Sequence, residues 1–79
     1  MKDQIFKEIV EIVSKVLRIN KKKINIKSRS SNEKNWDSLA NFNILLALEK
    51  KYKLRIKTKD YEKLNNLKDI VKLIERSIR

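Results

Sequence analysis

The chain has 79 residues, of which 39% are charged and 41% hydrophobic, and its formal net charge is +11. A chain of this length forms one small domain, so we expect residues 1–79 to be a single unit. It has no cysteine and no histidine, which excludes disulfides, thiolate metal sites and the nucleophile pairs built from these residues. The absence of glycine excludes a glycine-rich phosphate loop. We therefore expect a binding or carrying module with no metal site, and not an enzyme.

The positive charge gathers in two segments. Residues 20–35 carry six bases and one acid, and residues 50–59 carry six bases and no acid, which together account for the whole excess of +11. Such a balance is typical of proteins that bind polyanions. A/T-rich codon usage is the other interpretation, because lysine, isoleucine and asparagine supply 35 of the 79 residues. A small nucleic-acid-binding bundle is therefore an alternative, although the bases fall largely in predicted loops and we expect no specific nucleic-acid partner.

No segment predicts a membrane span. The longest run without a charge, residues 38–48, has 11 residues, whereas a spanning helix needs about 20. The first residues carry charges every few positions and lack the pattern of a secretory signal. We expect a cytoplasmic protein.

Apolar spacing predicts a first helix over residues 3–18. It should end near Asn20, because asparagine tolerates the left-handed turn that glycine usually supplies. A second helix is expected over residues 37–52, with Asp37 as its N-cap. Its apolar residues occupy more than one face, so part of this surface should meet a partner or ligand. The residues predicted to face the core are Leu39, Phe42, Leu45 or Leu46, Leu48 and Tyr52.

The remaining residues predict connections and one more main helix. Residues 20–36 show no sustained period and read as a long, structureless connection, mobile over residues 28–35. Residues 53–58 are expected to be an extended linker that anchors Leu54 and Ile56 in the core, followed by one short helical turn over 60–64. Asn66 should cap a last helix that runs to about Ser77. The predicted fold is all-α, a small three- to four-helix bundle with a long loop between its first and second helices.

Three motifs resemble the acyl carrier protein family. The first, Asp37-Ser38-Leu39, begins a long helix after a long loop. The other two follow at the family's usual spacing without a gap. They are Leu48-Glu49-x-x-Tyr52-x-x-x-Ile56 and Leu67-x-Asp69-Ile70-Val71-x-x-Ile74. The first predicted helix also matches the family in length and periodicity, so the resemblance covers nearly all of the chain.

The resemblance implies a discrete acyl or aminoacyl carrier. Ser38 would bear 4′-phosphopantetheine, attached by a phosphopantetheinyl transferase, and cargo would ride on its thiol as a thioester. Asp37 would cap the helix and help to bind the metal at the transferase during loading. The implied partners are this transferase and the enzymes that load and transfer acyl groups, and we expect the carrier to be a monomer. A carrier-like module that is never loaded is a further alternative.

The resemblance also assigns side chains to two surfaces. Trp36 is expected either to face a partner or to pack as a lid on the bundle, where it would anchor the loop. The other residues expected to face partners are Leu39, Asn43 and Lys50. The residues expected to bound a channel for an acyl chain between the helices are Phe42, Leu46, Tyr52, Ile56, Ile70 and Ile74.

Two departures from the family pattern stand out. Asn35 occupies the position of a usual glycine, so we expect it to adopt a positive φ. Carriers of bacterial fatty acid synthesis place several acids on the helix after the serine, whereas Glu49 is the only acid of the second helix here. The corresponding positions hold Ala40, Asn43, Lys50 and Lys51. This favours a carrier of a specialised biosynthetic pathway, with neutral or acidic partners.

Overall fold

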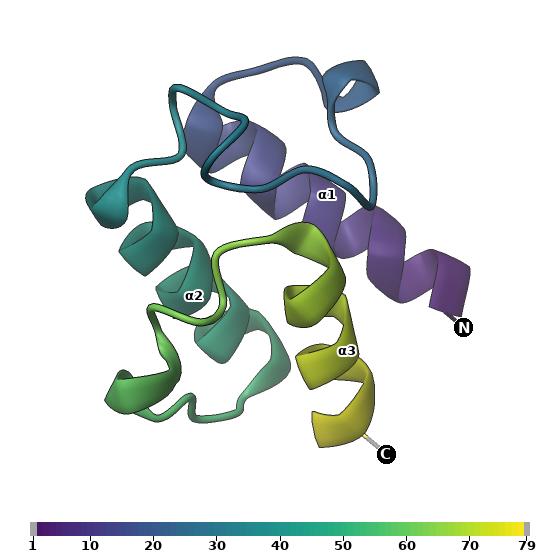
Figure 1. Ribbon diagram of the computed structural model, residues 1–79. Helices are drawn as coiled ribbons and strands as arrows, with labels where there is room; N and C mark the ends of the chain where they lie inside the picture. The colour runs from purple at the N-terminus through teal and green to yellow at the C-terminus, as the bar shows by residue number, and fades with distance from the viewer. Residues whose placement is uncertain (1, 79) are drawn as a thin grey trace.

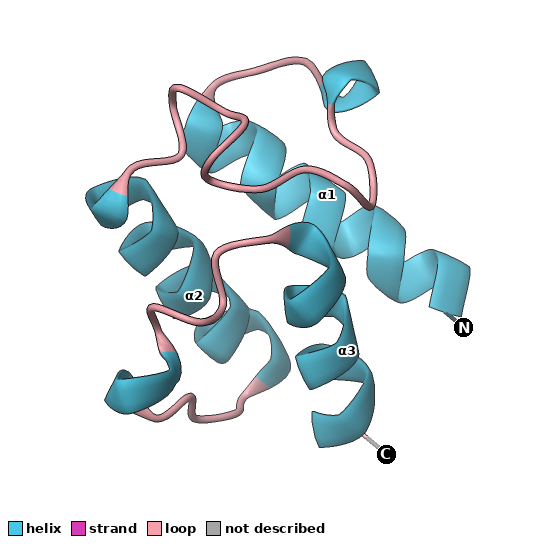
Figure 2. Cartoon of the chain, in the orientation of Figure 1, coloured by secondary structure: helices cyan, strands magenta, loops and turns pink. Residues whose placement is uncertain are grey.

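A computed structural model describes residues 2–78, and the elements that it places there are three α-helices and two short 3₁₀ turns, with no strand in this range. Figures 1 and 2 show a small helical bundle in which a long loop joins the first two helices. The predicted all-α architecture is confirmed. The elements are α1 (Lys2–Leu17), η1 (Lys21–Lys23), α2 (Ser38–Tyr52), η2 (Thr58–Asp60) and α3 (Leu67–Ser77).

The core lies where α1 packs against both α2 and α3. Every helix contributes aliphatic side chains at spacings of three and four residues, so each buries one stripe. Burial of one such side chain contributes about 2 kcal/mol of hydrophobic free energy. The largest fully buried side chains are Ile9, Val13, Ile44, Leu45, Leu48, Leu67, Ile70 and Ile74. None of the helices within residues 2–78 combines the length and apolar character needed to cross a membrane.

The N-caps of α2 and α3 are those that the sequence predicts. The Asp37 carboxylate accepts a hydrogen bond from the backbone N–H of Ala40 at 2.8 Å. The Asn66 side chain accepts one from the N–H of Asp69 at 2.9 Å, and donates its own amide N–H to the Asp69 carboxylate at 3.0 Å. Each cap satisfies a donor that the first turn of a helix cannot pair internally.

The left-handed residues that end α1 and α2 are basic rather than asparagine. Arg18 has φ of 57° and Lys53 has φ of 53°, and these are the positive φ values among the described residues. The expectations for Asn20 and Asn35 are therefore wrong. Asn20 instead caps η1 by accepting from the N–H of Lys22 at 2.8 Å, and Asn35 donates its side-chain amide to the carbonyl of Leu17 at 3.0 Å.

The predicted core-facing stripe of α2 is partly wrong. Leu39 is 68% exposed, Phe42 45% and Leu46 42%, so these three side chains form an outer stripe. Apolar residues surround this helix almost completely, and hydrophobic period alone therefore does not determine which face is buried. The residues that do face the core are Ala40, Asn41, Ile44, Leu45 and Leu48.

The loop between α1 and α2 is long, as predicted, but it is not structureless. Ile24, Ser28 and Trp36 are buried in it. Two backbone hydrogen bonds pair the loop with the chain just before α3, from the N–H of Ser30 to the carbonyl of Asn65 and from the N–H of Leu67 to the carbonyl of Ser28, both at 2.9 Å. These contacts hold the segment that leads into α2.

Trp36 joins the end of this loop to α2. Its side chain is 2% exposed, and its indole N–H donates to the Asn41 side-chain oxygen at 2.9 Å. The Asn41 amide in turn donates to the backbone carbonyl of Tyr61 at 3.0 Å. Trp36 therefore packs as a lid on the bundle, where its ring has apolar contacts and its N–H has a buried acceptor. The expectation that Trp36 faces a partner is wrong, because its side chain is buried. We call these three residues the Trp36 link.

The segment after α2 is anchored as predicted. Ile56 is buried and Leu54 packs against the core. Glu49 fixes this segment from α2, because its carboxylate accepts from the N–H of Ile56 at 2.6 Å and from the Tyr61 hydroxyl at 3.4 Å. The short turn expected over residues 60–64 begins earlier, as η2.

Tyr52 connects α2 to α1 through its hydroxyl, which donates to the Glu8 carboxylate at 2.6 Å. This bond is the largest cause of the lowered pKa of Glu8, followed by the amide of Gln4. The pKa of Tyr52 is raised, first by desolvation and then by the hydrogen bond to Glu8. The pair therefore favours a charged Glu8 and a neutral Tyr52.

Replacing Asn41 with alanine should lower the free energy of unfolding by about 2 kcal/mol, because the Trp36 N–H and the Tyr61 carbonyl lose a buried partner. Urea unfolding would measure this loss. The matched control is Asn43→Ala, on the same helix but exposed, which should change stability by less than about 0.5 kcal/mol. Equal midpoints for the two variants would show that the Trp36 link does not stabilise the fold.

Replacing Tyr52 with phenylalanine should destabilise the protein near neutral pH and have less effect in acid. Because the pKa of Glu8 is lowered in the folded state, its contribution to stability is fully present at pH values above the ordinary pKa of 4.5. This contribution is lost as the pH falls through the lowered pKa. Urea unfolding of both proteins across this range would follow the difference. In a Glu8→Gln background the effect of Tyr52→Phe should become independent of pH there, and a persisting dependence would contradict this assignment.

Candidate functional site

The candidate site begins with Ser38, the first residue of α2, whose side chain is exposed. Asp37 precedes it with extended backbone and turns the chain into the helix. The Asp37 side chain accepts from the N–H of Ala40 at 2.8 Å, and its carbonyl accepts from the N–H of Asn41 at 2.9 Å. Ser38 is therefore held at a fixed helix start while its hydroxyl remains open to solvent.

The first turn of α2 also offers a favourable field for an anion. The N–H groups of Ser38 and Leu39 come too early in the helix to reach a helical carbonyl. Together with the helix dipole, such groups favour a phosphate at this end of a helix. Covalent attachment at the Ser38 hydroxyl would place a phosphodiester close to them.

A groove of about 760 Å³ lies beside Ser38. The loop before α2 forms one wall, and the segment between η2 and α3 forms the other. Phe42 and Tyr61 provide an aromatic side, with ring centroids 5.5 Å apart. Its two charged lining residues, Asp37 and Glu62, are both acids. The full lining is Ser30, Ser31, Trp36, Asp37, Ser38, Asn41, Phe42, Tyr61, Glu62 and Asn65.

The groups around Ser38 suit attachment rather than catalysis. The Asp37 carboxylate is occupied as an N-cap, and the chain has no histidine that could act as a base. Within residues 2–78 no three acidic side chains come together as metal ligands. The site can thus present a hydroxyl and shelter an attached group, but it lacks the base that would activate the hydroxyl.

The outer face of α2 extends the site away from Ser38. Leu39, Asn43 and Lys50, which we expect to face partners, are all exposed. Phe42 and Leu46 lie on the same outer face rather than between the helices, and this corrects their assignment to an inner channel. Each lies three or four residues from a neighbour in this set, so the five side chains form one continuous surface along the helix.

The other residues expected to bound an acyl channel lie inside the bundle. Ile56, Ile70 and Ile74 are buried, and Tyr52 is half-buried with its hydroxyl on Glu8. Their placement among the helices is as expected, and their contact with an acyl chain stays a prediction.

Sequence reasoning missed Asn41 and Tyr61, which organise the groove. The available signal was a polar residue within the apolar run of α2, at spacings of three, four and seven from Ile44, Leu45 and Leu48. A buried asparagine requires hydrogen-bond partners. Its position therefore marked a polar contact inside the bundle, although nothing in the sequence identified Tyr61 as the acceptor.

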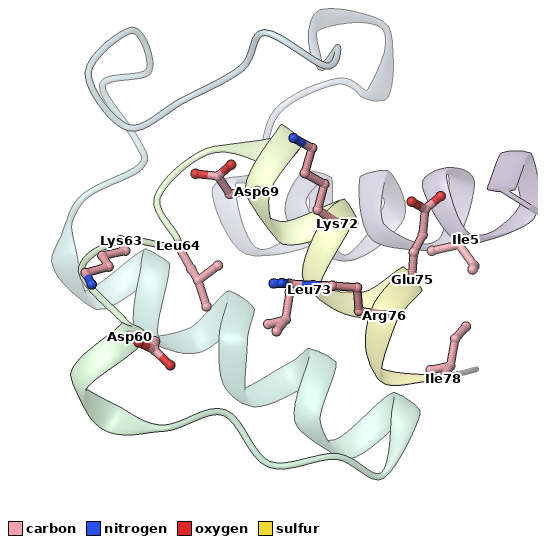
Figure 3. A pocket seen from close by; sticks show the side chains of 10 residues that line it. All are labelled: Ile5, Asp60, Lys63, Leu64, Asp69, Lys72, Leu73, Glu75, Arg76 and Ile78. Atoms are coloured by element: carbon pink, nitrogen blue, oxygen red, sulfur yellow. The ribbon is translucent and has the colours of Figure 1, made fainter.

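A second groove, of about 730 Å³, lies between α3, the start of α1 and residues 60–64 (Figure 3). Side chains of both charges surround it, including Asp69, Lys72 and Arg76, around apolar Leu64 and Leu73. None of the residues predicted to act in function lines this groove, so Ser38 and its neighbours form the stronger candidate.

No protein-family model matches the chain, but individual curated proteins do. An acyl carrier protein of Cyanidium caldarium is 33% identical over 73 residues, which cover 92% of this chain and 85% of that protein. One of Brachyspira hyodysenteriae is 36% identical over 86% of this chain and 88% of its own length. One of Wolinella succinogenes is 31% identical over 90% of this chain and 93% of its own length. The chain therefore belongs to the acyl carrier protein family, whose members carry acyl groups for other enzymes and catalyse no reaction of their own.

Proposed function

We propose that this carrier is modified at Ser38 with 4′-phosphopantetheine and moves thioester-bound acyl or aminoacyl groups between enzymes. The observation that carries the proposal is the exposed Ser38 hydroxyl, at a helix start fixed by Asp37 and beside a groove. Once attached, the group supplies the thiol that the chain itself lacks. The residues at the site fit the group, because the first turn favours its phosphate and the groove can accommodate a flexible chain.

Loading requires a separate phosphopantetheinyl transferase. A P–O bond forms at the Ser38 hydroxyl oxygen, the pyrophosphate bond of coenzyme A breaks, and adenosine 3′,5′-bisphosphate leaves. The serine proton passes to a base of the transferase, so the Asp37 carboxylate can keep its N-cap hydrogen bond to Ala40. Asp37 holds the turn during this step, and we propose that it also approaches the metal of the transferase.

The enzymes that load and transfer acyl groups contact the outer face of α2 in this proposal. Leu39, Phe42 and Leu46 form an exposed apolar stripe there, and such stripes are characteristic of interaction sites. The basic residues at the end of α2 distinguish this surface from the acidic one expected of carriers of bacterial fatty acid synthesis. This difference supports a role in a specialised pathway. The Glu49 carboxylate, which accepts hydrogen bonds from Ile56 and Tyr61, offsets only part of this charge.

Incubation with coenzyme A and a broad-specificity phosphopantetheinyl transferase should add one phosphopantetheine, detected by intact-protein mass spectrometry. Ser38→Ala should abolish the addition because the attacking oxygen is gone, while the fold survives a change at an exposed position. Ser31→Ala is the matched control, since Ser31 lines the same groove and should leave loading intact. Modification of the Ser38→Ala protein would refute the assignment, and a folded parent that gains no mass would favour the unloaded interaction module.

Truncating the outer stripe should weaken loading without unfolding the protein. We expect Leu39→Ala and Leu46→Ala each to lower kcat/KM of the transferase about tenfold, the effect of about 1.4 kcal/mol of lost interface contact. Ile26→Ala is the control, because Ile26 is similarly exposed at 44% but lies in the loop before α2. An equal loss in all three variants would argue against a specific contact on α2.

A further inference from the structure

We propose that the enzymes served by this carrier, its transferase included, dock on the outer face of α2 through an acidic surface. The complementary feature on the carrier is a basic rim at the end of α2 and in the segment that follows. We define the basic rim as Lys50, Lys51, Lys53, Arg55, Lys57 and Lys59, all of which are exposed. This inference rests on the proposed function, in which enzymes act at Ser38.

The basic rim lies within reach of an enzyme that works at Ser38. Twelve residues of α2 separate Ser38 from Lys50, which corresponds to about 18 Å along the helix. A standard protein interface covers about 800 Å² on each partner, a patch roughly 30 Å across. Ser38 is the first residue of α2, and Figure 1 shows the segment that contains the rest of the basic rim continuing from the end of this helix. A partner seated along α2 therefore meets both.

Few acids lie near the basic rim, and on α1 the Glu8 carboxylate is close enough to Lys51 to interact with its charge. Glu49 is the one acid between Ser38 and Lys59, and its carboxylate is engaged by Ile56 and Tyr61. The one ion pair within 4.0 Å among the described residues joins Lys21 to Glu11, elsewhere in the molecule. The basic rim consequently presents six bases against the two acids Glu49 and Glu8, which leaves a positive excess toward an approaching partner.

The positive charge gathers in the basic rim and in residues 20–35, and only the basic rim follows the apolar stripe of α2 directly. The helix α3 carries three bases and two acids, and α1 as a whole carries equal numbers of each. Codon bias that added lysine wherever solvent tolerates it would not by itself exclude acids from ten consecutive residues. The concentration of bases next to the apolar stripe is the reason to assign this surface to a partner.

The apolar stripe identifies that partner as a protein. Leu39, Phe42 and Leu46 are exposed along the same face that leads to Lys50. An acidic protein surface with an apolar socket can bury these side chains and also pair with the bases. A nucleic-acid backbone offers phosphates for the basic rim but no comparable surface for the aliphatic side chains.

Complementary charge acts chiefly on encounter and on partner choice. Opposite charge accelerates association by factors of about 10 to 10³, and like charge disfavours the wrong partner. Salt reduces both effects, since the Debye length falls to about 8 Å at physiological ionic strength. An acidic partner should therefore bind more weakly as salt rises, and a basic one more strongly.

Two forms of one enzyme can test the inference. The probe is a phosphopantetheinyl transferase whose carrier-docking surface is basic, together with its variant in which those bases are replaced by glutamate. Calorimetry with coenzyme A present would measure Kd for the Ser38→Ala carrier, which cannot be loaded. We expect the acidic transferase variant to bind at least about tenfold more tightly, and this preference to shrink as salt rises.

Charge reversal on the carrier localises the effect. The triple variant Lys50→Glu, Arg55→Glu and Lys57→Glu, in the Ser38→Ala background, should reverse the preference. The matched control reverses Lys22, Lys23 and Lys27 to glutamate, which changes net charge equally in the loop that includes η1. This loop lies beside α1, on the opposite side of the molecule from the basic rim (Figure 1). The control should keep the preference for the acidic form.

Three results would overturn the inference. They are equal affinity for the two transferase forms, no measurable affinity for either, and a control variant that shifts the preference as much as the basic-rim variant. Retention of tight binding to a short DNA duplex at physiological salt, lost only in the basic-rim variant, would point instead to a polyanion partner. A parent protein that gains no phosphopantetheine would contradict the proposed function alone, because the binding measurements do not depend on loading.

Discussion

The hydrogen bond from the Trp36 indole to Asn41 is the contact on which the arrangement of the site depends. It brings the end of a long loop onto α2, and the Asn41 amide extends the connection to the carbonyl of Tyr61. The end of the loop, α2 and the segment before α3 thereby meet around one buried asparagine. Ser38 lies between these two residues in sequence, so the bond restrains the short stretch of chain that carries it. A hydroxyl that stays exposed can be presented accurately only if its neighbours are held in this way.

The helix starts were predictable because short-range chemistry determines them. An aspartate or asparagine before an amphipathic run supplies the acceptor that the first turn needs, and Asp37 and Asn66 do so. The orientation of α2 was not predictable in the same way. Leu39 and Leu46 are as apolar as Leu45 and Leu48, and only packing against α1 decides which pair is buried. The resemblance in sequence indicated the family, which the comparisons show, and suggested Ser38, whose role stays a proposal, but it did not separate outer from inner side chains on this helix.

The absence of glycine limits sequence reasoning in a different way. Asparagine was the natural expectation for a left-handed turn, yet Arg18 and Lys53 adopt it. A residue with a Cβ pays about 1 kcal/mol for this conformation, and packing around the helix end must compensate. Asn20 and Asn35 are used instead for their side-chain hydrogen bonds. Local propensity thus gave the approximate ends of α1 and α2, while the choice of residue depended on contacts that form only in the folded protein.

The burial of Trp36 has a practical consequence. It is the only tryptophan of the chain, it lies two residues before Ser38, and its side chain lines the groove beside the proposed attachment point. Indole emission depends on the polarity around the ring, and no second tryptophan contributes background. The intrinsic fluorescence of the unlabelled protein can therefore follow events in the groove directly, and it distinguishes cargo that enters the groove from cargo that stays in solvent.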